Sequence, residues 1–113
     1  MKNFKQTIVI FTICFFFSAN SSGSGYVEDA RKYFDKGEYN SAIIQLKNHL
    51  INVPEDAQAR LLLGQSYQKS GNVSGAYKEF EKAYKINKND SKIQLAYASV
   101  LKLKNENEKV KEV

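Results

Sequence analysis

Cys14 and His49 are the two side chains best suited to nucleophilic or acid–base chemistry, and each is the only residue of its type in the 113 residues. One cysteine allows no disulfide within the chain, and one cysteine with one histidine cannot complete a zinc site. A single histidine also leaves out the two-histidine metal motifs. We therefore predict no catalytic site, no metal and no cofactor, and a protein that is not an enzyme.

The formal net charge of +5 is unevenly distributed along the chain. Lys2 and Lys5 lie in the first five residues, and every acidic residue lies at Glu28 or beyond. From residue 20 onward, fifteen basic and twelve acidic side chains give a net charge of only +3. Such a mixed, weakly basic domain is poorly suited to nucleic acid, which favours basic residues clustered on one face.

The first twenty residues have the pattern of an export signal. Lys2 and Lys5 precede an apolar run over residues 7–17, TIVIFTICFFF, and small and polar residues follow from Ser18 to Gly25. A charged start, a short apolar stretch and a small-residue exit are typical of a secretory signal peptide. We predict a signal peptide over residues 1–20 and a Ser/Gly linker over residues 21–25, with retention as a membrane tether left open.

Cys14 lies inside this apolar run and has two interpretations. A lipidated bacterial cysteine usually follows a leucine three positions before it and a small residue directly before it, and here Phe11 and Ile13 hold those places. The sequence favours a cysteine that acts as a small hydrophobic residue within the signal.

The remainder of the chain repeats with a period of 34 residues. Tyr33 aligns with Tyr67, and Gly37 aligns with Gly71. This period, with small and aromatic residues at matched places, resembles the tetratricopeptide repeat (TPR), in which antiparallel helix pairs stack into a superhelix. The resemblance implies an all-α fold of about two and a half repeats, over residues 23–56, 57–90 and, in part, 91–113.

Each signature residue of the repeat has a physical reason. Small residues let neighbouring helices approach closely, apolar residues at helical spacing fill the layer between them, and glycine takes the left-handed conformation that ends a helix. The expected packing residues are Tyr33, Gly37, Ala42, Leu63, Gly64, Tyr67, Gly71, Ala76, Phe80 and Ala83.

Turn residues predict helices near 25–36, 40–52, 56–70, 74–87 and 91–104, within a TPR domain over residues 26–104. Residues 105–113 form a charged tail, and a sixth helix begins within residues 102–113 without completing the third pair. Repeat arrays usually need about three units. The half repeat therefore indicates a marginally stable domain, pairing with a second copy or a partner, or the leading piece of a longer TPR protein.

Several segments are similar to a narrower group. Residues 26–33, 42–48 and 59–64, together with Gly37 and Pro54, look like the opening repeats of PEP-CTERM (exosortase-associated) TPR-repeat lipoproteins. This resemblance implies an exported accessory of exopolysaccharide production or C-terminal protein sorting. Its expected location is periplasmic, envelope-associated or secreted.

TPR arrays usually bind partners in a groove lined by the first helix of each pair. The repeat register places these residues in the expected groove: Val27, Arg31, Phe34, Leu61, Leu62, Gln65, Gln68, Lys69, Lys92, Leu95, Ser99 and Lys102. An alternative is that Phe34, Leu62 and Leu95 pack between helices instead. The asparagine of chaperone-binding TPR clamps is absent, since Glu28 and Leu62 hold its places.

A mixed apolar and amide surface with scattered cations suits an extended peptide or an amphipathic helix. We expect a non-enzymatic exported scaffold for protein–protein interaction. The alternatives are a polysaccharide-associated accessory whose exposed tyrosine and glutamine side chains contact sugar, and a fragment of a longer TPR protein. His49, at a position where the repeat expects alanine, is interpreted as a packed histidine rather than a ligand or base.

Overall fold

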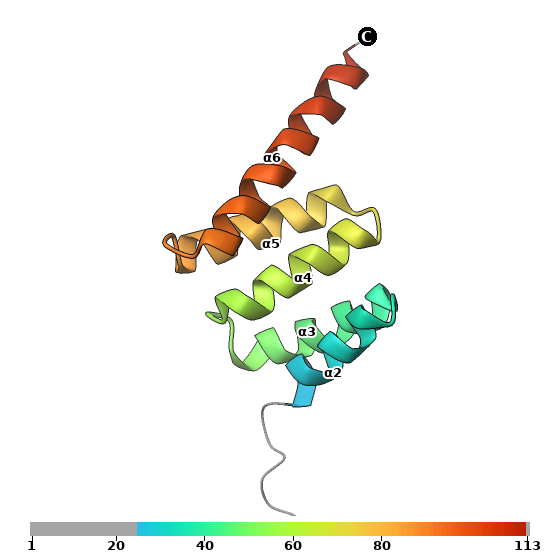
Figure 1. Cartoon of the computed structure of the whole chain (residues 1–113), viewed down its shortest axis with the longest axis vertical. Helices are drawn as coiled ribbons and strands as arrows, with labels where there is room; N and C mark the ends of the chain where they lie inside the picture. The colour runs from blue at the N-terminus through green and yellow to red at the C-terminus, as the bar shows by residue number, and fades with distance from the viewer. Residues whose placement is uncertain (1–24, 113) are drawn as a thin grey trace, which may run out of the picture.

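The computed structural model describes residues 25–112, so the expected signal peptide, most of the linker and Cys14 lie outside the described residues. The described residues form α2 (Gly25–Asp35), α3 (Tyr39–Asn52), α4 (Ala57–Lys69), α5 (Val73–Ile86) and α6 (Ser91–Lys111), as Figure 1 shows. The predicted all-α fold is confirmed. The first four helices begin and end within one residue of the predicted positions.

Two glycines end the first helix of each complete pair. Gly37 and Gly71 have φ values of 78° and 86°, a left-handed conformation that glycine adopts without strain. The residue after each glycine donates its backbone N–H to the carbonyl of Tyr33 or Tyr67, five positions earlier, at 2.9 and 2.8 Å. These are Schellman motifs, and they reverse the chain so that the second helix packs against the first.

Asparagine and aspartate begin three of the helices. The Asp56 carboxylate accepts a hydrogen bond from the backbone N–H of Ala59 at 3.0 Å, and Asp90 does the same for Ile93 at 3.2 Å. The Asn72 side chain caps α5 in the same way. Each cap satisfies a helical N–H that has no partner within its own helix, so the turns fix where α4, α5 and α6 start.

The helices pack in chain order and form two layers. Each helix contacts the next one along the chain, and α4 also contacts α2 and α6. The first helices of the pairs, α2, α4 and α6, therefore lie in one layer, with α3 and α5 in the other (Figure 1).

Two hydrophobic cores hold the successive helix pairs together. The core between the first pair and α4 contains Ala30, Ala42, Leu46, Leu50, Ala59, Leu62 and Leu63. The core between α4, α5 and α6 contains Leu61, Ala76, Phe80, Ala83, Ile93 and Val100.

The residues expected to pack the repeat lie at these junctions and turns. Ala42, Ala76, Phe80 and Ala83 are fully buried, and Leu63 is 2% exposed. Tyr33 and Tyr67 are half-buried beside the first core, while the two glycines of the turns are exposed.

Gly64 is buried where α4 packs against the Phe80 ring of α5. A Cβ atom built there would lie 2.5 Å from Cδ1 of Phe80, well inside van der Waals contact. Only glycine fits this position without moving the ring.

Three tyrosines occupy the α5–α6 junction. Tyr97 stacks on Tyr84 with ring centroids 5.3 Å apart and lies 6.0 Å from Tyr77, while the Lys104 ammonium lies 4.4 Å from the Tyr77 ring. The Tyr77 hydroxyl donates to Glu81 at 2.7 Å, and this hydrogen bond, with one to Tyr97, raises the pKa of Tyr77. At the equivalent positions of the preceding junction the residues are aliphatic: Ile43, Leu50 and Leu63.

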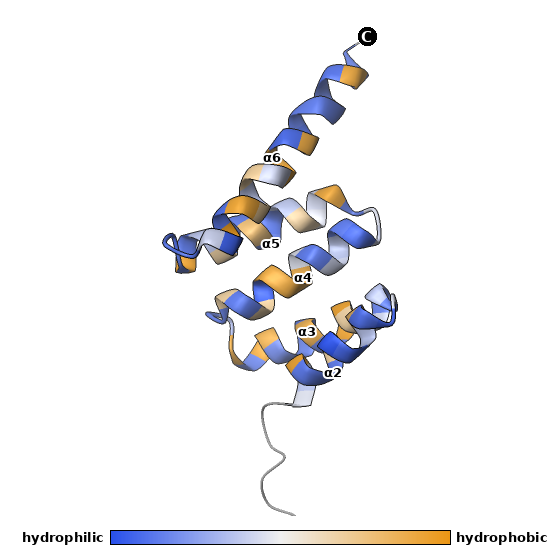
Figure 2. Cartoon of the chain, in the orientation of Figure 1, coloured by the Kyte–Doolittle hydropathy of each residue, from blue (hydrophilic) through white to orange (hydrophobic). Residues whose placement is uncertain are grey.

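The C-terminal residues differ from the prediction. Instead of ending near residue 104, with a sixth helix beginning within residues 102–113, α6 continues without a break to Lys111. The position equivalent to Gly37 and Gly71 holds Asn105, which stays helical, so no Schellman turn reverses the chain. Beyond Lys104 the helix extends away from the other helices, and its surface is mostly hydrophilic (Figures 1 and 2).

Candidate functional site

The exposed side of α2, α4 and α6 is the candidate binding surface, which we name the first-helix face. On α4, Gln58, Gln65 and Lys69 follow one another at helical spacing on the side away from α3 and α5. The equivalent positions, 34 residues on, are Lys92, Ser99 and Leu103 of α6; the first two are exposed and Leu103 is half-buried. Three adjacent helices held by buried cores thus present one continuous surface.

Most of the residues expected in the groove are accessible. Arg31, Lys69, Lys92, Ser99 and Lys102 are exposed. Val27, Phe34, Gln65 and Gln68 are half-buried. The Phe34 ring packs edge-on against Tyr39 at 5.3 Å, which makes it part of the first turn as well as of the surface.

Two residues expected in the groove, Leu61 and Leu62, are buried instead. Leu61 is 5% exposed in the core formed with α5 and α6, and Leu62 is 6% exposed in the core formed with α2 and α3. The neighbouring first helices close over both flanks of α4, so neither leucine is available to a ligand. Leu62 thus packs between helices, as the alternative interpretation of the sequence expected. That alternative is wrong for Leu95, because 73% of its surface is exposed.

Gln58 is a surface residue that the sequence analysis missed. Its side-chain amide donates to the Asp90 carboxylate at 2.6 Å and so joins the start of α4 to the start of α6. That hydrogen bond, followed by the backbone N–H of Ile93, lowers the pKa of Asp90. With Gln65 and Gln68, Gln58 makes the α4 part of the first-helix face rich in amides. Its counterpart one repeat further on, Lys92, is among the expected groove residues, so the 34-residue register contained a signal for Gln58.

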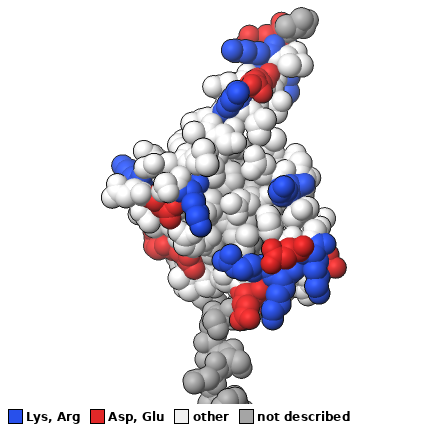
Figure 3. All heavy atoms as spheres, in the orientation of Figure 1, with Lys and Arg blue, Asp and Glu red and all other residues white. Residues whose placement is uncertain are grey.

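The centre of the first-helix face carries little charge. Figure 3 shows basic and acidic side chains over α2, along the projecting end of α6 and at the edges of the molecule between them, around a largely uncharged centre. On α2, Lys32 and Glu28 pair at 3.6 Å. The centre of the face can therefore hydrogen bond to a peptide through amides, and Lys69 and Lys92 add positive charge beside it.

His49 and Asp56 join the two complete repeats. His49 Nε2 lies 2.8 Å from Asp56 Oδ2, and the histidine side chain is 10% exposed. Burial acts to raise the pKa of Asp56, but the Ala59 N–H and His49 outweigh it and hold that pKa below its ordinary value. His49 is thus a packed residue with a structural partner, as its position in the repeat indicates.

Arg60 and Gln94 explain how a lysine can replace the turn proline. Arg60 Nε donates to the carbonyl of Pro54 at 2.9 Å, and Gln94 Nε2 donates to the carbonyl of Lys88 at 2.6 Å. These donors and acceptors are equivalent in the 34-residue register. The turn depends on a backbone carbonyl at this position rather than on the proline ring.

Arg60 also makes a largely buried ion pair. Its Nη1 lies 2.8 Å from Glu79 Oε2, and the two side chains are 14% and 12% exposed. The pair fixes α4 to α5 at the position where the TPR pattern usually has an aromatic residue.

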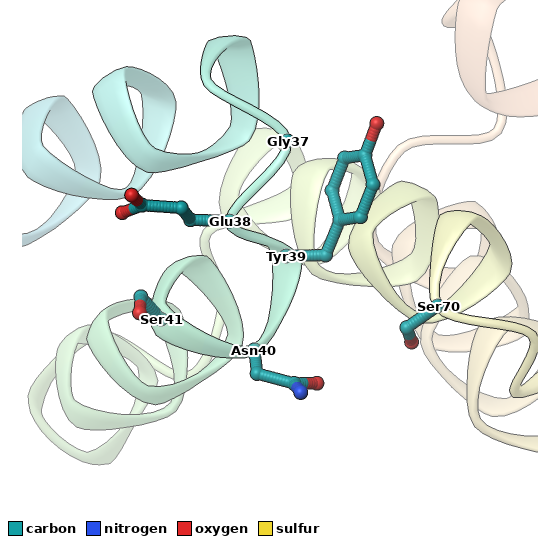
Figure 4. Close-up of a pocket in the computed structure, with 6 residues that line it drawn as sticks. All are labelled: Gly37, Glu38, Tyr39, Asn40, Ser41 and Ser70. Atoms are coloured by element: carbon teal, nitrogen blue, oxygen red, sulfur yellow. The ribbon is translucent and has the colours of Figure 1, made fainter.

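Two open hollows lie outside the first-helix face. One of about 310 Å³ is lined by Gly37, Glu38, Tyr39, Asn40, Ser41 and Ser70. Figure 4 shows the side chains of Asn40 and Ser70 extending toward the same space from α3 and from the end of α4. The other, about 350 Å³, lies beside Pro54 and Arg60, where Lys82 and Lys85 also line it.

The described residues hold no cluster of three or more histidine, cysteine or acidic side chains able to bind a metal ion. No helix within residues 25–112 combines the length and the apolar character needed to cross a bilayer.

Comparison with known families assigns the fold. Residues 24–113 match the family described as the TPR domain of cytochrome c-type biogenesis protein H. No curated protein matches the chain. The family match confirms the TPR assignment and gives no support to the narrower resemblance to PEP-CTERM lipoproteins. TPR domains are repeat scaffolds that bind protein partners. Since the match spans most of the chain, the protein belongs to the TPR-domain family of cytochrome c-type biogenesis protein H.

Proposed function

We propose that this protein is an exported scaffold that holds a segment of a partner protein across the first-helix face. The observation that carries the proposal is the accessibility of Arg31, Gln65, Lys69 and Ser99 on three adjacent helices whose other sides are buried in two cores. A rigid surface of amides and cations can bind a peptide backbone and acidic side chains without ordering itself first. The expected ligand is an extended peptide or an amphipathic helix.

Export is the second part of the proposal, and it rests on the sequence. The lysines, the apolar run over residues 7–17 and the Ser/Gly exit support passage across a membrane, followed by cleavage or by retention as a tether. The mass of the N-terminal peptide of the protein recovered from cell fractions tests this. A full-length cytosolic chain would contradict export.

The family name supplies one candidate setting. A family defined on a cytochrome c-type biogenesis protein supports a periplasm-facing role in which the partner is another biogenesis protein. The PEP-CTERM resemblance supports a different setting, in exopolysaccharide production or protein sorting. A direct polysaccharide contact is the rival function, and titration of the protein with the host's exopolysaccharide separates the two, because a protein scaffold predicts no direct affinity.

Variants of matched charge test the binding surface. Arg31→Gln with Lys69→Gln removes two cations from the first-helix face, and Lys47→Gln with Lys78→Gln removes two exposed cations from α3 and α5. Partner recovery from the host envelope should fall about 30-fold or more for the first pair, because the two lost charged hydrogen bonds together cost roughly 2 kcal/mol or more. Partner recovery with the second pair should stay close to that of the unchanged protein. Equal recovery with both pairs would argue against this surface.

A further inference from the structure

The open side of α6 is equivalent to a side of α4 that the fold buries. In the 34-residue register Leu61 corresponds to Leu95, and Gly64 corresponds to Ala98. Leu61 is 5% exposed and Gly64 is buried, whereas Leu95 is 73% exposed and Ala98 is exposed. The same residue types therefore lie in a core on one helix and in solvent on the other.

The reason for this difference is the position of α6 in the stack. On α4 this side is covered by α5 and α6, which supply Phe80 and Ile93. Within residues 25–112 no helix covers the corresponding side of α6. Leu95, Ala98 and Leu101 form a row along it with a spacing of three residues, and Leu101 is half-buried. We name this row the α6 ridge.

At the opposite end of the stack, charged residues of α2 occupy positions that are apolar in α4. The positions equivalent to the buried Leu62 and Leu63 are Glu28 and Asp29 of α2, and both are exposed. Glu28 also pairs with Lys32. Seating an α6 ridge on this surface would remove charged groups from water without partners, which is costly. Head-to-tail stacking of copies is therefore unfavourable. A symmetric contact between two α6 ridges buries no such charges and avoids this cost.

We propose that the α6 ridge docks against the α6 ridge of a second copy of this chain. The row is symmetric about Ala98, so an antiparallel crossing centred there places Leu95 against Leu101 of the second copy, and the reverse. The small alanine at the centre lets the two helices approach closely, as Gly64 does between α4 and α5. Such a contact is isologous and closes on itself as a dimer.

The polar residues beside the ridge are compatible with this register. The same crossing brings Lys102 opposite Gln94 of the second copy, and Asn105 opposite Ser91 of the second copy, so no like charges meet. One helix crossing lies at the small end of interface sizes, where association is weak. We expect a dissociation constant of roughly 10–100 μM. Leu95 is also one of the expected groove residues, but the contact is centred on Ala98, and the inference does not depend on the proposed function.

Sedimentation of the full chain between roughly 10 μM and 1 mM tests the proposal. The unchanged protein should form a dimer, and Ala98→Glu should weaken association by about 100-fold or more, because two carboxylates would meet without partners at the crossing. Ser99→Glu, one residue away on the first-helix face, is the control and should dimerise normally. Both substitutions are at exposed helical positions, so folding should be unaffected, which circular dichroism checks.

Disulfide trapping gives a second readout that does not depend on affinity. In a Cys14→Ser background, Ala98→Cys should form a covalent dimer on oxidation, since the two side chains face each other at the crossing. Ser99→Cys should form at least tenfold less covalent dimer. Three results would overturn the proposal: an unchanged protein that stays monomeric to 1 mM, an Ala98→Glu variant that still dimerises, or equal trapping at both positions. The second would place the contact elsewhere, for instance in the N-terminal apolar segment.

Discussion

Replacing Gly64 with alanine adds one methyl group where α4 packs against the Phe80 ring of α5. The new Cβ would lie 2.5 Å from Cδ1 and 3.1 Å from Cζ of Phe80, whereas carbon atoms in contact prefer about 3.5–4.0 Å. Phe80 is fully buried, so its ring has to move within a packed core or α5 has to move with it. Such overpacking costs about 1–3 kcal/mol.

Helix propensity acts in the opposite direction. Alanine is favoured over glycine in a helix interior by about 1 kcal/mol, so the expected net loss of stability for Gly64→Ala is about 1 kcal/mol. For a domain of this size that lowers Tm by roughly 4–8 °C. Urea unfolding followed by far-UV circular dichroism measures the free energy of unfolding directly.

Two further variants separate crowding from propensity. Ala98→Gly makes the reverse change at the equivalent but exposed position, and it should cost about 1 kcal/mol from propensity alone. Phe80→Leu, combined with Gly64→Ala, should cost less than the two single changes added together, because the ring that the methyl group meets is gone. A Gly64→Ala protein about 1 kcal/mol more stable than the parent would show that the position has room, and would refute the close packing described here.

Three more predictions follow from the hydrogen bonds and turns. Arg60→Leu should destabilise the fold by about 2–3 kcal/mol in urea unfolding, because it leaves the largely buried Glu79 carboxylate without its arginine, and adding Glu79→Leu should recover part of this loss. The pKa of Asp56 is lower in the fold than its ordinary value of 3.8, so its contribution is present above that value and is lost as the pH falls through the folded pKa. Asp56→Asn should therefore flatten the acid side of a stability-against-pH curve, and a curve with the parent slope would contradict the stabilising role of the Asp56 charge. Gly71→Ala should cost about 1–2 kcal/mol, since an alanine at a φ of 86° is strained, and Gly71→Asn should cost less; equal stability of all three proteins by thermal unfolding would exclude a strained turn.

The sequence predicts the helix pairs well because their ends are set by local chemistry. Gly37 and Gly71 mark turns that only a left-handed residue can make, and Asp56 and Asp90 provide the caps. These residues act within a few positions of themselves, so spacing alone shows where the helices end. The end of α6 was harder to predict because Asn105 can either stop a helix or remain in it.

The sequence predicts less well which residues of the candidate surface are exposed. Leu61 and Leu62 have the same spacing as surface residues, and only the packing of α2, α3, α5 and α6 around α4 buries them. The role of Arg60 was equally hidden, because its partners come from a turn carbonyl and from α5. Such contacts depend on how the repeats are placed against one another, which a one-dimensional register does not contain.

The most direct test of the partner-binding face is photo-crosslinking in the native host. A photoreactive amino acid replaces Gln65, at the centre of the first-helix face, or Lys78, on the exposed side of α5. We predict that position 65 captures one defined envelope protein, that position 78 captures at least tenfold less of it, and that Arg31→Gln with Lys69→Gln lowers the capture at position 65 about 30-fold or more. Capture of the same protein at position 78 with equal yield, or no capture at position 65, would contradict this prediction.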